Sequence, residues 1–137
     1  ANNGSFGGKT IMSEAGITES HADPDLKSEL DAGMVTNYTK GGFNCHIDTK
    51  DPSFKCPETE LSNPLVRDLV HDCMKNRVGY YGWMGIGGAI LQWNPEHKIG
   101  FGYVPFDLML CDMVNVRASD IQKKIVEIVK NQSNTMS

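Results

Sequence analysis

The chain has 137 residues, of which 39% are hydrophobic and 22% are charged, a composition typical of one soluble globular domain. Its formal net charge of -4 does not favour binding to nucleic acid or to an anionic membrane surface. No apolar run approaches the roughly 20 residues of a membrane span, and no targeting segment is recognised. The classes to consider are therefore a globular enzyme and a binding module. The sequence does not indicate a cellular compartment.

The first half of the chain predicts few regular elements. Residues 1–12 are glycine-rich and predict an irregular or extended lead-in, after which Ser13 can cap a helix over residues 13–20. Residues 21–33 are polar and predict a connection. Residues 33–47 predict strand structure that Gly41 and Gly42 interrupt with a turn or bulge, and residues 48–62 predict a polar loop.

The second half predicts a helix, a hairpin and a final helix. Residues 63–76 predict a helix with an apolar stripe. Asn63 can cap this helix, and Pro64 fits its first position. Residues 89–93 and 99–105 predict strands joined by the turn at residues 94–98. Ser119 is expected to cap the last helix over residues 119–132, with Ile121, Ile125, Ile128 and Val129 packing on the sheet. We therefore predict an α+β fold with an antiparallel sheet, over residues 1–137, as one domain or as a fragment of a larger one.

Candidate metal, cofactor and catalytic residues are scattered. Four cysteines form no C-x-x-C pair and are interpreted as reduced, buried thiols: Cys45, Cys56, Cys73 and Cys111. Cys45 and His46 could begin a metal site, but no second pair of cysteine or histidine residues follows at the spacing that metal ligands need. No metal is therefore expected. All four histidines are interpreted as solvated: His21, His46, His71 and His97. Asp68 and Asp72 are interpreted as solvent-facing rather than as a paired acid and base. Methionines 34, 74, 84, 109 and 113 are interpreted as core residues.

The glycines at positions 79, 82, 85, 87 and 88 are the densest signal in the sequence. They match neither the G-x-G-x-x-G pattern nor the P-loop, so no nucleotide cofactor is expected. One interpretation is a strand that runs close to a neighbouring backbone. The other is a strand edge along a cleft, where Cβ atoms would block a substrate.

The stretch from Gly82 to Pro105, GWMGIGGAILQWNPEHKIGFGYVP, resembles the late strand pair of the serine β-lactamase-related superfamily. That superfamily contains class C β-lactamases, penicillin-binding proteins and related esterases. Residues 2–19, NNGSFGGKTIMSEAGITE, are similar to a segment that precedes those strands. The resemblance covers nearly the whole chain in order and implies the C-terminal part of a β-lactamase/transpeptidase-like fold.

The family's reactive motifs are absent from this sequence. No S-x-x-K supplies the nucleophile and its lysine, and no Tyr-x-Asn or Ser-x-Asn follows. At the third motif, H-x-G or K-T-G in the family, one alignment places Trp83-Met84-Gly85 and another places Tyr80-Tyr81-Gly82. Neither has a cation for a substrate carboxylate, which argues against penicillin-like substrates.

Two hypotheses follow from the resemblance and its gaps. The first is a segment of a serine hydrolase that supplies one wall of the substrate cleft and is inactive alone, the catalytic residues lying in a preceding part of the parent chain. The second is a non-catalytic binding or interaction module on the same fold. Either predicts an unpaired sheet edge and apolar surface that pair with the parent chain or with another copy.

Overall fold

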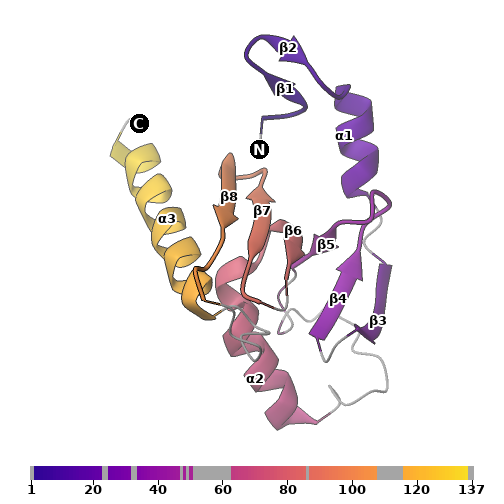
Figure 1. Cartoon of the computed structure of the whole chain (residues 1–137), viewed down its shortest axis with the longest axis vertical. Helices are drawn as coiled ribbons and strands as arrows, with labels where there is room; N and C mark the ends of the chain where they lie inside the picture. The colour runs from indigo at the N-terminus through magenta and orange to yellow at the C-terminus, as the bar shows by residue number, and fades with distance from the viewer. Residues whose placement is uncertain are drawn as a thin grey trace.

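The computed structural model describes residues 2–22, 25–31, 34–46, 48, 50, 63–85, 87–107 and 116–135. A two-stranded sheet pairs β1 (Ser5–Phe6) with β2 (Lys9–Thr10). A six-stranded sheet has the order β3-β4-β5-β6-β7-β8, and each neighbouring pair is antiparallel. Three α-helices accompany these sheets in the described residues, which confirms the α+β class (Figure 1).

Local capping signals set the first two helices. In α1 (Glu14–His21), Ser13 Oγ accepts a hydrogen bond from Gly16 N at 3.1 Å, as predicted for a helix cap. In α2 (Pro64–Met74), Asn63 Oδ1 accepts from Leu65 N at 3.0 Å, with proline at the start of the helix. A short 3₁₀ helix, η2 (Lys75–Arg77), continues α2 into the sheet. Most of the predicted loop at residues 48–62 lies outside the described residues.

The strands before α2 differ in part from the prediction. β4 (Met34–Tyr38) and β5 (Asn44–Cys45) join through a turn that contains Gly41 and Gly42, as expected. The polar connection predicted over residues 21–33 is wrong, because β3 (Asp25–Asp31) pairs there with β4. Its sequence, DLKSELD, has weak intrinsic strand preference, so the neighbouring β4 determines its conformation.

The predicted hairpin is confirmed. β7 (Ile90–Asn94) and β8 (Ile99–Tyr103) pair in register from Ile90 opposite Tyr103 to Asn94 opposite Ile99. β6 (Tyr81–Met84) precedes them and pairs with β7 on its other side. The sheet therefore ends at β8.

The last helix starts earlier than predicted. α3 runs over Val116–Thr135, so Ser119 lies inside the helix, where its buried hydroxyl accepts a hydrogen bond from Asn76 Nδ2 at 3.2 Å. Its packing stripe is also rotated from the predicted one. Ile125 and Val129 pack against the core, whereas Ile121 and Ile128 are 43% and 48% exposed.

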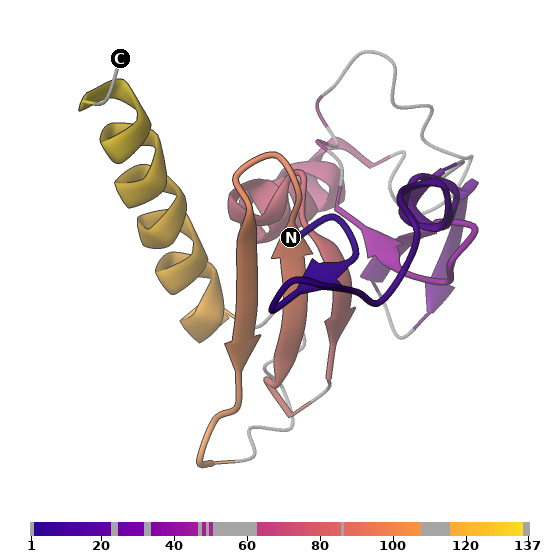
Figure 2. The same ribbon diagram turned by 90° about the horizontal axis from the view of Figure 1, so that it is seen from above.

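Burial alternates along β7 and β8 and defines two faces of the sheet. On the closed face lie the buried residues Ile90, Gln92, Asn94, Ile99 and Phe101, covered by α3 together with Tyr80. On the open face lie Leu91, Trp93, Gly100 and Gly102, together with Trp83 from β6. The β1–β2 hairpin lies on one side of β7 and α2 on the other (Figure 2).

Close approach of two backbones explains one glycine of the dense run. Gly82 has φ of +123°, and a Cβ there would collide with Leu91 O and lie 2.9 Å from Gln92 Cα. Gly79 and Gly88 also have positive φ, of +81° and +93°. The close-approach interpretation is therefore confirmed for Gly82, whereas Gly85 has no such constraint, since a Cβ there would meet only Ala89 at 3.7 Å.

Candidate functional site

Among the described residues, no strand pairs with the outer backbone edge of the second half of β6. Gly85 N donates to Ala89 O at 2.7 Å, so the odd-numbered residues of β6 hydrogen-bond to β7 and the even-numbered ones point away. β5 pairs with β6 only at Tyr81 and Gly82. The N–H and C=O of Met84 therefore point beyond the end of β5, where no described strand pairs with them.

In the alignment that places the family's third motif at Trp83-Met84-Gly85, the three residues differ in exposure. Trp83 is 51% exposed on the open face, and its ring centroid lies 5.5 Å from that of Tyr38. Met84 turns its side chain to the closed face and packs against the core. Gly85 is exposed, and a Cβ added there would make only an ordinary contact with Ala89, at 3.7 Å. This placement combines an aromatic side chain, an open backbone edge and a bare glycine.

The second placement is buried. Tyr80 has no exposed surface and belongs to the core cluster, and Gly82 is buried against β7. Tyr81 is half-buried, and burial followed by the neighbouring Cys45 raises the pKa of its phenol. Two of the three residues at this placement, Tyr80 and Gly82, are therefore closed off from the surface.

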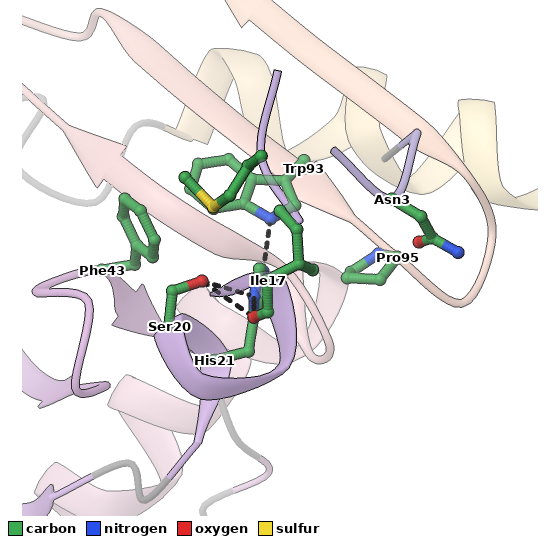
Figure 3. A pocket seen from close by; sticks show the side chains of 8 residues that line it. Asn3, Ile17, Ser20, His21, Phe43, Trp93 and Pro95 are labelled. Carbon is green, nitrogen blue, oxygen red and sulfur yellow. Dashed lines mark hydrogen bonds between the residues drawn. The ribbon is translucent and has the colours of Figure 1, made fainter. Parts of the chain in front are cut away.

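A ring cluster ties α1 to the sheet (Figure 3). Trp93 Nε1 donates to His21 Nε2 at 2.8 Å, and the other ring nitrogen, Nδ1, lies 2.8 Å from Ile17 O. Phe43 and Tyr81 complete the cluster, with ring centroids 5.9 Å and 4.5 Å from that of His21. The prediction that His21 is solvated is therefore wrong. Beside the ring lies a cavity of about 140 Å³.

The hydrogen bonds of His21 exclude a serine–histidine pair at Ser20. Because Nε2 accepts from the indole, Nδ1 carries the proton and donates to Ile17 O. Ser20 Oγ lies 3.2 Å from that protonated nitrogen and donates to Ile17 O at 2.8 Å. No lone pair on His21 is left to accept a proton from the hydroxyl.

The closed face contains a buried polar chain. Arg77 Nε donates to Gln122 Oε1 at 3.1 Å, and Gln122 Nε2 donates to Gln92 Oε1 at 2.7 Å. Gln92 Nε2 donates to His46 Nε2 at 2.8 Å. Burial, and then the charge of Arg77, lowers the pKa of His46 to about 3, so its ring is neutral at physiological pH. His46 is 5% exposed, so the prediction that it is solvated is wrong.

Buried and titratable groups elsewhere fit structural roles. Cys45 is a buried free thiol as predicted, and burial raises its pKa, which disfavours the reactive thiolate. Asp68 and Asp72 are exposed, as predicted. His71 is half-buried, and its Nδ1 lies 3.1 Å from Asp48 Oδ1. Met74 is buried, as predicted; the side chains of the other three cysteines lie outside the described part of the chain.

An apolar groove runs along the open face. It encloses about 500 Å³ and has no charged side chain in its lining, which comes from the β1–β2 hairpin, α1, β7 and β8. Three apolar side chains beside it are largely in solvent: Phe6, Ile11 and Leu91, at 72%, 75% and 68% exposed. Such a surface is typical of a contact face rather than of a free one.

Comparison with protein-family models, with curated proteins and with solved structures gives no match. Among the described residues, no group of three or more His, Cys, Asp or Glu side chains is placed to hold a metal ion. No helix in the described ranges has both the length and the apolar character that crossing a bilayer requires.

Proposed function

We propose that this chain forms one wall of the substrate cleft of a serine hydrolase related to the β-lactamases, the reactive groups lying in polypeptide outside this sequence. The observation that carries the proposal is the open edge of β6 at Met84, beside the exposed Gly85. A backbone edge of this kind can hold an extended substrate or donate an N–H to a developing oxyanion.

The chain's own side chains do not complete a catalytic set in the described residues. Ser20 faces a protonated ring nitrogen of His21, and the buried His46 already accepts a hydrogen bond from Gln92 at its Nε2. Trp83 at the third-motif position offers an aromatic ring instead of a cation. The proposed substrate is therefore an ester or amide without a carboxylate at this position, and the proposal favours the placement at residues 83–85.

The test compares the 137-residue chain with the complete product of its gene, using nitrocefin and nitrophenyl acetate. We expect no hydrolysis by the chain alone and ester hydrolysis by a gene product that contains S-x-x-K upstream. In that product, Gly85→Val should lower kcat/KM on the order of a hundredfold by displacing substrate. Gly100→Ala is the matched control, because nothing lies within 4 Å of its added Cβ. Hydrolysis by the chain alone would refute the proposal.

The apolar groove supports a second candidate, a non-catalytic binding module on the same fold. Exposed Phe6, Ile11 and Leu91 around an uncharged groove favour contact with another polypeptide. A gene product without S-x-x-K that still forms a stable complex in size-exclusion chromatography would support this candidate over the hydrolase.

A further inference from the structure

The N-terminal segment, residues 2–22, is joined to β7 through one side chain. Trp93 Nε1 donates to His21 Nε2 at 2.8 Å (Figure 3), and among the described residues this is the one hydrogen bond between residues 2–22 and strands β6 to β8. The other hydrogen bonds that leave the segment within the described chain reach the turn between β4 and β5, such as the bond from Lys40 N to Ala22 O at 3.1 Å. They hold only the last residues of the segment.

Apolar burial adds little to this attachment. The helix α1 contains no buried residue, and Phe6 and Ile11, in and beside the β1–β2 hairpin, are largely exposed. Burial of an apolar face is what normally fixes a helix on a sheet. The position of residues 2–21 on the sheet therefore depends on the ring of His21 and its hydrogen bond to Trp93.

A protonated His21 cannot keep this hydrogen bond. Nδ1 already carries a proton and donates to Ile17 O, so a second proton binds only at Nε2. The indole nitrogen of Trp93 is a donor and cannot accept, so the two N–H groups would then point at each other. One of the two rings has to move away. Imidazole is the side-chain group that ordinarily takes up such a proton between about pH 8 and about pH 5.

No charged group beside the ring would hold an imidazolium in place. The lining of the 140 Å³ cavity next to the ring contains no acidic or basic side chain besides His21 itself. On β6, Tyr81 contacts the ring, and burial followed by the neighbouring Cys45 of β5 raises the pKa of its phenol, which is therefore uncharged. Burial also raises the pKa of the Cys45 thiol, so β5 supplies no anion either.

The charged side chains of the surrounding elements are engaged or lie elsewhere. Lys40, on the turn between β4 and β5, pairs with Glu19 of α1 at 3.3 Å, and both side chains are mostly in solvent. Glu14 in the first turn of α1 is exposed. Glu96 follows the cavity-lining Pro95 but lines a separate cavity of about 410 Å³ beside η2. An imidazolium at position 21 is therefore better stabilised by water than by its native contacts.

We propose that protonation of His21 releases residues 2–21 from β7, so that acid uncovers the open face of the sheet. Residues 2–17 contribute one side of the apolar groove of about 500 Å³, and β7 and β8 contribute the other. The bonds from the end of α1 to the turn between β4 and β5 remain and act as the hinge. The device changes which apolar surface is available for contact, and it does not depend on hydrolase activity.

NMR of the unmodified chain between about pH 8 and about pH 4.5 tests the proposal. We expect the indole N–H signal of Trp93 and the amide signals of α1 to shift together with the ring signals of His21. Nuclear Overhauser contacts between His21 and Tyr81 should disappear in acid. The side-chain amide signals of Gln92 and Gln122, in the buried polar chain, should persist, which separates release of the segment from unfolding of the whole chain.

Substitutions separate the effect of the proton from that of the ring. His21→Gln keeps an acceptor for the indole N–H but binds no proton, so its ratio of attached to released segment should change less than about twofold, against at least about tenfold in the native chain. Trp93→Phe keeps an aromatic ring without the donor and should loosen α1 already at about pH 8. His97→Gln is the matched control, because it removes another partly exposed histidine and should leave the transition unchanged.

A ring of His21 that is fully protonated while its contacts with Tyr81 persist would overturn the proposal. The same transition in His21→Gln would do so too. Loss of the Gln92 and Gln122 signals at the same pH would show unfolding of the whole chain instead, and a ring that stays neutral down to about pH 4.5 would show that no such device operates.

Discussion

On the closed face of the β6–β8 sheet, Gln92 is a polar side chain that is buried and hydrogen-bonded, whereas on the open face large apolar side chains are exposed to solvent. Gln92 and Leu91 are neighbours in β7, yet Gln92 is 1% exposed and Leu91 is 68% exposed. The closed face contains an arginine and a histidine, but both are engaged in one hydrogen-bonded chain. The comparison teaches that the buried arginine and histidine of the closed face serve the fold, whereas the open face leaves large apolar side chains unburied.

The largest expected change in stability comes from Gly82 in β6, and Gly85, immediately after the same strand, is its comparison. Gly82→Ala should destabilise the chain by about 4 kcal/mol, because the new Cβ meets the backbone of Leu91 and Gln92 at a positive φ. Gly85→Ala should change the free energy of unfolding by less than about 0.5 kcal/mol. Urea denaturation of both variants measures the two free energies of unfolding. Equal losses of stability would contradict the contrast between the tightly packed Gly82 and the exposed Gly85.

A smaller effect is expected from the buried polar chain. Gln122→Leu removes the hydrogen bonds that Gln122 makes with Arg77 Nε and with Gln92 Oε1, both buried, and should cost about 3 kcal/mol in the free energy of unfolding. Gln132→Leu, at an exposed position of the same helix, should cost almost nothing. Thermal unfolding of the pair measures the difference. A Gln122→Leu variant as stable as the native chain would mean that the chain of hydrogen bonds adds little.

The smallest effect concerns pH. The pKa of His46 falls from 6.5 to about 3 on folding, so the unfolded chain binds a proton that the folded chain rejects. Stability should therefore rise with pH over this interval and level off above it, with a slope of about 1.4 kcal/mol per pH unit from this group. Denaturation at pH 6 and pH 5 measures the slope, and His46→Gln should reduce it. An unchanged slope in the variant would show that other groups cause it.

Local signals predicted much of the fold. The caps at Ser13 and Asn63, the turn at residues 94–98 and the apolar periodicity of the last helix are encoded within a few residues of one another. They were sufficient for three helices and the β7–β8 hairpin. The start of α3 was missed by three residues, because Ser119 resembles a cap but pairs with Asn76, far along the chain.

Long-range contacts explain the remaining errors. β3 depends on pairing with β4, and His21 and His46 acquire their partners from β7. The alternation of Ile90, Gln92 and Asn94 was a usable signal that Gln92 faces the core, because residues two apart in a strand share a face. The histidines have no comparable local signal.

The amino-acid sequence by itself determined the α+β class, the hairpin and the position of the dense glycine run, because these depend on propensity, capping and periodicity between near neighbours. Only the tertiary structure decided which backbone groups of Met84 face outward. That direction depends on strand register and on where a neighbouring strand stops. Both are set by contacts between residues distant in the chain, and the proposed cleft wall rests on them.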